Sequence, residues 1–192
     1  MDKRIYLCLA HMSGKEQDFI REAFDTNWVV PLGPNVNGFE QDLETFVGEN
    51  KHVVALSAGT AAVHLSLLAC GVGVGDEVMV QSFTFCASSH PVTYLGATPV
   101  FVDSEEDTWN MDPQLLDMAI ADRIAKTGKK PKAIVPVYLY GMPAKLDEIM
   151  AVADGGHRGG GLRHEHHAYD GQHHVRQAEF AFLHVSSGPG PP

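Results

Sequence analysis

The sequence predicts an α/β protein whose sheet is mostly parallel and is covered by helices on both faces. Helical and strand patterns alternate from residue 13 to about residue 154. The short strand segments are apolar throughout, as expected of strands that are buried on both faces. The chain has 192 residues, of which 44% are hydrophobic and 20% charged, values that are ordinary for a globular domain with its own core.

The first two elements are expected to be helices. Ser13 and Glu16 have the spacing of a capping box, which places a helix start at this point. The apolar stripe of this helix is formed by Phe19, Ile20, Ala23 and Phe24. Residues 27–37 are expected to be irregular, and a second helix then ends near Gly48. Its buried face is expected to consist of Leu43, Phe46 and Val47.

Strands and helices alternate after residue 52. The expected strands are residues 53–56, 77–81, 99–102 and 133–137. The expected helices are residues 60–70, 84–95, 112–124 and 144–153, and Pro91 should interrupt or shift the second of these. Asp112 and Pro113 open the third helix, because Asp favours the cap position and Pro the first turn. Its inward side chains are expected to be Leu115, Leu116, Ala119, Ile120 and Ile124.

Charge and composition exclude several classes of partner. The net charge is −10, which disfavours binding to nucleic acid or to anionic membranes. The N-terminus has no apolar segment of signal-peptide length, and no stretch is long enough to span a membrane, so a cytoplasmic protein is expected. Cys8, Cys70 and Cys86 form no CxxC pair and are interpreted as buried reduced thiols.

The composition changes abruptly after residue 154. Residues 155–192 contain seven of the eleven histidines, at positions 157, 164, 166, 167, 173, 174 and 184. The segment is rich in glycine and has a single apolar run, so it is not expected to bury enough surface to become ordered. The predicted organisation is a domain over residues 1–154 followed by an atypical, disordered or out-of-frame tail over residues 155–192.

An anion site is predicted where the segment 57–62 joins an expected strand to a helix. Gly59 allows a tight turn and a close backbone approach, and the free N–H groups at the helix start attract an anion. Thr60 adds a hydroxyl donor. The alternative is a glycine turn with a threonine cap, and the segment lacks the lysine of a Walker motif. Residues 71–75 are glycine-rich, but they follow a helix and precede a strand, which is the reverse of a dinucleotide-binding motif.

Two further residues lie just after expected strands. Phe85 could stack on a flat heteroaromatic ligand held at the neighbouring phosphate site, although core packing is the more usual role of such a side chain. Asp103 could meet a ligand cation, but a bond to the backbone of the following turn is favoured.

Five stretches resemble the sugar aminotransferases of the DegT/StrS group, in order and at matching spacing. They are HMSGKEQDFIREAFDTNWVVPLGPNVNGFE (11–40), ALSAGTAAVHLSLL (55–68), GDEVMVQSFTFCASSHPV (75–92), GATPVFVDSEEDTWNMDP (96–113) and PKAIVPVYLYGMPAKLDEI (131–149). The resemblance implies the fold type I aminotransferase architecture, with a seven-stranded, mostly parallel sheet in its large domain, of which this chain is a truncated N-terminal part.

The resemblance also implies a cofactor, substrates and partners. Gly59 and Thr60 would hold the phosphate of pyridoxal 5′-phosphate, and Phe85 would stack on its pyridine ring. Trp28, Gly33 and Pro34 match the loop that approaches the nucleotide-sugar. The family reaction moves an amino group from glutamate to a nucleotide-linked keto-sugar, for exopolysaccharide or surface-glycan synthesis, and the family works as a homodimer.

The chain departs from the family pattern in three places. Tyr138 stands where members often carry His, and His90 where Asn is common. The third departure is that the VEDAA-type motif, whose Asp pairs with the pyridine nitrogen, and the Schiff-base lysine are both missing, because no lysine follows Lys145. The chain as written is therefore expected to have no catalytic residue of its own and to be an inactive fragment.

Three other interpretations stay open. The sheet domain could be a non-catalytic module whose tail binds a metal ion through imidazoles. The tail histidines concerned are His164, His166, His167, His173 and His174. The chain could derive from a related sugar dehydratase, which differs at the lysine position, or it could be a non-functional fragment that leaves a sheet edge uncovered.

Overall fold

The computed structural model describes residues 11–48 and 51–155, and these form two compact units that divide between Ala55 and Leu56. The first unit contains the helices α1 (Glu16–Asp25) and α2 (Pro34–Val47). The second contains the helices α3 (Gly59–Ala69), α4 (His90–Tyr94), α5 (Pro113–Thr127) and α6 (Leu146–Ala153), with the 3-10 turns η1 (Cys86–Ser88) and η2 (Leu139–Gly141). Its strands are β1 (Glu77–Gln81), β2 (Thr98–Val102) and β3 (Ala133–Val135).

The second unit is built on a parallel sheet with the strand order β2-β1-β3. Glu77 pairs with Thr98 at one end of the β1–β2 ladder and Gln81 with Val102 at the other, while Val78 pairs with Ala133 on the other side of β1. All three strands run in one direction, so their carboxyl ends lie at one edge of the sheet. The prediction of a mixed α/β unit with a parallel sheet is therefore confirmed.

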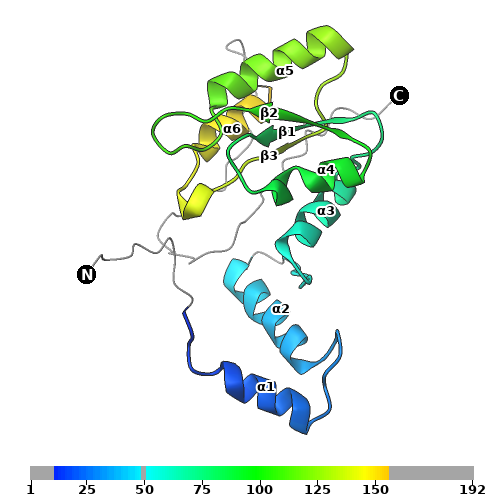
Figure 1. Cartoon of the computed structure of the whole chain (residues 1–192), viewed down its shortest axis with the longest axis vertical. Coiled ribbons are helices and arrows are strands. Elements are labelled where there is room, and N and C mark those ends of the chain that lie inside the picture. The colour runs from blue at the N-terminus through cyan, green and yellow to red at the C-terminus, as the bar shows by residue number, and fades with distance from the viewer. Residues whose placement is uncertain (1–10, 49–50, 156–192) are drawn as a thin grey trace, which may run out of the picture. The chain divides into compact units, whose positions relative to one another are not determined.

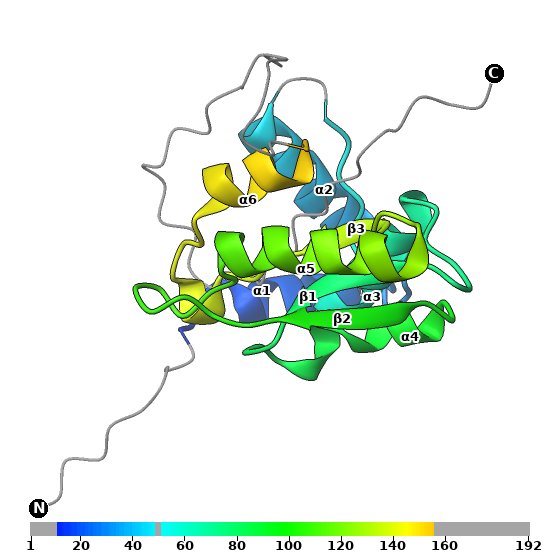
Figure 2. The ribbon, with the colours of Figure 1, turned by 90° about the horizontal axis from the view of Figure 1, so that it is seen from above.

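Helices cover both faces of this sheet, because alternate residues of β1 point to opposite sides. Val78 and Val80 enter an apolar cluster with α3 and α4, whereas Met79 enters a second cluster with α5 and α6. Figure 1 shows α5 and α6 on one side of the strands and α3 and α4 on the other. In Figure 2, α5 lies in front of the strands. The result is a three-layer α/β unit with two apolar layers.

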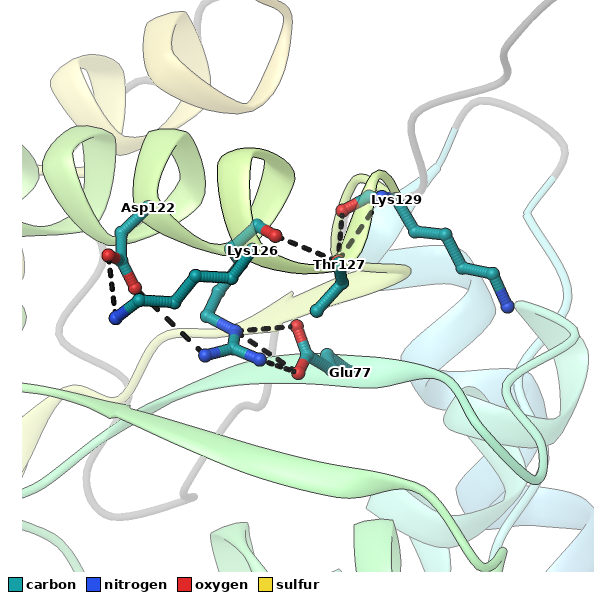
Figure 3. Close-up of polar contacts among 6 residues, drawn as sticks. Glu77, Asp122, Lys126, Thr127 and Lys129 are labelled. Carbon is teal, nitrogen blue, oxygen red and sulfur yellow. Dashed lines mark hydrogen bonds and ion pairs between the residues drawn. The ribbon is translucent and has the colours of Figure 1, made fainter.

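Helix α5 begins and is anchored as its sequence predicts. The Asp112 carboxylate accepts hydrogen bonds from the N–H groups of Gln114 and Leu115, at 2.7 and 3.2 Å. On the side of the sheet, the Arg123 guanidinium binds the Glu77 carboxylate of β1 through both Nε and Nη2, with a shortest distance of 2.7 Å (Figure 3). These contacts fix both the start of α5 and its distance from the sheet.

The inward face of α5 is narrower than expected. Leu116 and Ile120 are buried, but Leu115 and Ile124 are exposed, so their assignment to the core was wrong. Only side chains about one turn apart on the sheet-facing stripe reach the strands. The expected helix over residues 84–95 is also shorter: it consists of η1 and α4, because Pro91 lies in the first turn of α4 and starts a new helix.

The first unit has local order without a core. Within the described residues, neither α1 nor α2 has a buried side chain, and Phe19, Ile20, Phe24 and Phe46 are exposed. The expected burial of the α2 face is therefore wrong for this unit. The capping box is half formed, because the Glu16 carboxylate accepts from the Ser13 N–H at 2.6 Å while the Ser13 hydroxyl accepts from Lys15 instead of Glu16.

The apolar run 53–56 is not a strand, which corrects the prediction. It pairs with no strand of the described sheet, and Val54 and Leu56 are exposed. Two of its N–H groups instead donate to carboxylates of α2: Val53 to Glu44 at 3.0 Å, and Ala55 to Glu40 at 2.7 Å. The two acceptors are one helical turn apart, so they match the two-residue spacing of an extended chain.

The structure bears on two expectations that came from composition, one about membrane-spanning segments and one about the cysteines. No helix in residues 11–48 and 51–155 combines the length and the hydropathy that a membrane crossing requires. Cys70 and Cys86 are free thiols, but Cys86 is exposed and Cys70 half-buried, so the expectation of burial is wrong for these two. Cys8 and residues 156–192, which make up almost all of the predicted tail, lie outside the described residues.

Candidate functional site

The predicted anion site lies at the first turn of α3. Ala58 is extended, with φ −163° and ψ 157°, and no side chain caps the helix. The carbonyl of Ala58 accepts from the N–H groups of Ala61 and Ala62, at 3.0 and 3.1 Å. Within the described chain, the N–H groups of Gly59 and Thr60 have no acceptor. They are therefore available to an anion.

Gly59 leaves open space at the start of α3, but the turn at this position does not require a glycine. Its φ is not among the positive values of this chain, so an ordinary residue could adopt this conformation. A Cβ at Gly59 would meet no atom within 4 Å. The tight-turn part of the prediction is thus not required by the backbone, while the open approach to the helix start is present.

Phe85 is not a core residue, which excludes the alternative of core packing. Its side chain is 66% exposed, and it immediately precedes η1. η1 contacts α3, so the segment that starts at Phe85 lies on the same face of the sheet as the helix that starts at Gly59. The structure thus places these residues in one unit and on neighbouring elements.

An exposed aromatic pair that was not predicted from the sequence lies at the carboxyl edge of the sheet. The rings of Phe83 and Trp109 meet edge to face, with centroids 6.1 Å apart, and both are largely exposed. Trp109 has a positive φ of 62°, a conformation that a bulky residue rarely adopts. The position of Phe83, two residues after an expected strand, was the available signal for one member of the pair.

Asp103 has the turn role that was favoured for it. Its carboxylate accepts from the N–H of Ser104 at 2.8 Å and from the hydroxyl of Ser82 at 3.2 Å. These bonds join the segments that follow β1 and β2. Asp103 therefore joins the segments at this edge of the sheet through one of its carboxylate oxygens, Oδ1.

Two buried amides, which sequence analysis also missed, occupy the same edge. Gln81 and Asn110 are fully buried, and their side chains approach each other at 3.4 Å. We call this pair the amide clamp. The signal for it was a buried-strand pattern, Val78 to Val80, that ends on the polar residue Gln81, because strands covered on both faces are normally apolar throughout.

An ion cluster lies beside the clamp. The buried Glu105 carboxylate accepts from the Thr108 hydroxyl and from the Lys145 ammonium, the latter at 2.9 Å. Lys145 also pairs with Asp107 at 2.8 Å. The Thr108 hydrogen bond, followed by that of Lys145, lowers the pKa of Glu105 to about 2. The bonds to Asp107 and Glu105 raise the pKa of Lys145, so its ammonium stays protonated.

The predicted substrate-contacting residues lie together in the first unit. Trp28, Gly33 and Pro34 all line one surface pocket, with Glu22, Val30 and Leu32 among its other residues. Gly33 has a φ of +140°, and a Cβ there would lie 3.1 Å from the Trp28 ring. Only glycine therefore fits beside this indole.

The other candidates have ordinary surroundings or lie outside the description. The ring of His90 is 6.4 Å from that of Tyr94, and Tyr138 packs against the α5–α6 cluster. Within residues 11–48 and 51–155, no group of three metal-ligating side chains occurs. The histidines proposed for a metal site, 164 to 174, are outside these residues.

Comparison with known proteins gives consistent matches to the part of the chain that carries these features. EpsN of Bacillus subtilis (strain 168), which carries the name of a pyridoxal phosphate-dependent aminotransferase, is 51% identical over 154 residues, covering 80% of this chain and 39% of EpsN. GDP-perosamine synthase of Caulobacter vibrioides is 41% identical over 150 residues, covering 78% of this chain and 38% of that protein. The chain thus spans about two fifths of the length of these relatives.

Structural comparison agrees. The crystal structure of a DegT DnrJ EryC1 StrS aminotransferase from Brucella abortus matches with a TM-score of 0.68 and 38% identity, over 74% of this chain and 38% of that one. The model of the DegT/DnrJ/EryC1/StrS aminotransferase family matches residues 11–157. The chain belongs to the DegT/DnrJ/EryC1/StrS aminotransferase family.

Proposed function

We propose that this chain supplies the phosphate-holding part of a pyridoxal 5′-phosphate site, in an enzyme that transfers an amino group to a nucleotide-linked keto-sugar for polysaccharide or glycan synthesis. The amino donor in this proposal is glutamate. The observation that carries the proposal is the uncapped first turn of α3, whose N–H groups at Gly59 and Thr60 have no acceptor in the described chain. The relatives' names supply the cofactor and the GDP-linked sugar.

The residues at the start of α3 fit a phosphate group. Two N–H donors without an acceptor in residues 11–48 and 51–155 lie at a helix N-terminus, where the helix dipole favours negative charge. Thr60 adds a hydroxyl, and the absence of a Cβ at Gly59 leaves room for a close approach. This donor set suits the phosphate of the cofactor better than a neutral ligand.

Phe85 is the residue proposed to contact the ring of the cofactor. When bound, pyridoxal phosphate supplies an electron sink for the transfer of the amino group. The role of Phe85 is to orient the flat ring by stacking and to exclude water from one of its faces. Its exposed side chain leaves a ring surface free for this contact, which contributes about 0.5–1.5 kcal/mol beyond the buried area.

Lys145 is not assigned the role of the lysine that holds the cofactor. Its ammonium lies 2.9 Å from Glu105 and 2.8 Å from Asp107. Both carboxylates favour the protonated form, which has no lone pair for nucleophilic attack. Lys145 instead joins the segment after β2 to the start of α6, so the covalent role belongs to another residue of the whole enzyme.

The substrate side of the proposal rests on the first unit. Trp28, Gly33 and Pro34 are proposed to contact the nucleotide-sugar, because they line one pocket and because the aromatic face of Trp28 can stack on a flat base. A homodimer is also proposed, and the exposed apolar side chains of α1 and α2 would be partly covered in it.

A charge placed at Gly59 tests the phosphate site. Gly59→Asp adds an anion at the first turn of α3, which stabilises the helix through its dipole but repels a phosphate. The matched control is Gly38→Asp, because a Cβ would also meet no atom within 4 Å at Gly38. We expect Gly59→Asp to keep its melting temperature and to weaken binding of pyridoxal 5′-phosphate by at least about tenfold, corresponding to roughly 1.4 kcal/mol.

Equilibrium dialysis of the 192-residue chain measures this binding, with pyridoxal, which has no phosphate, as the comparison ligand. The control variant is expected to bind like the unmodified chain. Equal affinity for pyridoxal and pyridoxal 5′-phosphate, or equal affinity of the two aspartate variants, would overturn the proposal.

A further inference from the structure

The amide clamp joins the segments that follow all three strands of the second unit. The Gln81 side chain donates to the carbonyl of Phe83 at 2.9 Å and accepts from the N–H of Met111 at 2.9 Å. The clamp therefore connects the segment after β1 with the segment that leads into α5.

Asn110 extends the same connection to the third strand. Its side chain accepts from the N–H of Leu139 at 2.8 Å and donates to the carbonyl of Met142 at 2.8 Å. These two residues lie at η2 and just after it, in the segment that follows β3. Both amide side chains are fully buried, so water has little access to them and their hydrogen bonds are strengthened by the low local dielectric.

The hydrogen bonds, and not packing alone, specify amides at these positions. Each side chain donates to one backbone carbonyl and accepts from one backbone N–H, which requires a group with both functions. A carboxylate at either position could not donate, and a leucine could do neither. Either change would remove a partner from backbone groups at this edge, and a leucine at position 81 would leave the buried N–H of Met111 without its acceptor.

The clamp also controls the direction of the chain toward the proposed cofactor site. Gln81 holds the carbonyl of Phe83, two residues before Phe85, while the Phe85 side chain itself has an exposed ring. Asp103 holds Ser82 from the neighbouring segment. The chain on the approach to Phe85 is thus held by hydrogen bonds at the Ser82 hydroxyl and the Phe83 carbonyl, whereas the Phe85 ring itself is exposed.

We propose that Gln81, supported by Asn110, is a positioning residue of the cofactor site. It acts through the backbone of Phe83 and sets the placement of the Phe85 ring without touching the cofactor. This inference rests on the proposed function, because it assumes that Phe85 stacks on the ring of pyridoxal 5′-phosphate.

The test separates the ring contribution to binding from the phosphate contribution. Gln81→Met keeps the side-chain length and removes both hydrogen bonds. We expect its affinity for pyridoxal 5′-phosphate to fall about two- to tenfold, which is the range of one aromatic stacking contact. Its affinity for inorganic phosphate is expected to stay unchanged, because the start of α3 is intact.

A double-variant cycle shows whether Gln81 acts through Phe85. Phe85→Leu alone is expected to cause a similar loss, and Gln81→Met combined with Phe85→Leu is expected to lose no more than Phe85→Leu. Ile120→Val, a core change in α5 away from the clamp, is the control for a general loss of stability and is expected to bind normally. Gln81→Glu, which keeps the acceptor for Met111 but not the donor to Phe83, is the second variant if Gln81→Met does not fold.

The outcomes distinguish the two proposals. If the unmodified chain does not prefer pyridoxal 5′-phosphate to inorganic phosphate and pyridoxal, the proposed function fails and this inference with it. If the unmodified chain binds, but the Gln81 variants bind equally well, or the losses at Gln81 and Phe85 add, the positioning role is overturned while the phosphate site stands.

Discussion

The two units of this chain differ in what their amphipathic helices bury. In the unit that begins at Leu56, alternate residues of β1 enter two apolar clusters, one on each face of the sheet. In the unit that ends at Ala55, α1 and α2 carry comparable apolar stripes but bury no side chain within the described residues. A periodic apolar stripe therefore predicts a helix, whereas burial of that stripe depends on a second apolar surface that packs against it.

The largest difference between the units is expected from truncation of apolar side chains. Leu116→Ala, in the buried face of α5, is expected to lower the free energy of unfolding by about 2–5 kcal/mol, because it removes buried contacts and leaves a cavity. Phe24→Ala, in the exposed stripe of α1, is expected to change it by no more than about 0.5 kcal/mol. Urea denaturation followed by circular dichroism measures both free energies of unfolding. Equal losses for the two variants would contradict the difference in burial between the two units.

A smaller effect is expected at the helix starts. Asp112→Ala removes two hydrogen bonds to the first turn of α5 and is expected to cost about 1 kcal/mol. Ser13→Ala removes a single long bond of 3.3 Å near α1, and is expected to cost less. Thermal unfolding of the two variants measures the difference. A loss for Ser13→Ala that equals or exceeds the loss for Asp112→Ala would contradict this expectation.

Two ion pairs on α5 allow the effect of burial on the strength of an ion pair to be measured within one helix (Figure 3). The pair of Lys126 with Asp122 is exposed, at 2.8 Å, and a pair of this kind is expected to contribute about 0.3–0.5 kcal/mol. The bidentate pair of Arg123 with Glu77 is partly buried, so its coupling free energy is expected to be larger and less sensitive to salt. Double-mutant cycles at low and high salt measure both couplings, and a pair at Glu77 that salt abolishes would contradict this expectation.

The smallest effect is expected from the pH dependence of stability that arises from a single carboxylate, that of Glu105. Hydrogen bonds from Thr108 and Lys145 lower the pKa of Glu105 from its ordinary 4.5 to about 2, so the native state binds fewer protons than the unfolded state in this range. The stabilisation is therefore present above pH 4.5 and is lost as the pH falls toward 2. Glu105→Gln is expected to flatten the dependence of stability on pH in this window. Glu106→Gln, an exposed neighbour, is the control, and an identical flattening in both variants would rule out this assignment.

Local signals in the sequence predicted most of the second unit. Strands were correctly expected at residues 77–81 and near 99–102, and Asp112 with Pro113 correctly marked the start of α5. The interpretation of the glycine-rich residues 71–75 as a connection between a helix and a strand is confirmed, because α3 ends before them and β1 begins after them. Each of these signals acts through neighbours in the chain, such as a cap that binds the N–H groups two and three residues later.

The candidate site could be predicted only in part. The start of α3 was predictable, because a helix that begins at a glycine after an extended residue is a local feature. The amide clamp was not, because Gln81 and Asn110 are 29 positions apart and obtain their partners from three different segments. The roles of Gly59, Thr60, Phe85, Trp28, Gly33 and Pro34 in binding stay predictions.

The sequence by itself determined where helices begin, which strands are apolar and which family the motifs resemble, because these depend on short-range geometry and residue type. The tertiary structure decided whether an apolar segment is buried. Residues 53–56 have the composition of a core strand, yet no described strand pairs with them, and their N–H groups bind the carboxylates of α2. A strand is defined by its neighbours, and the position of those neighbours is a property of the whole fold.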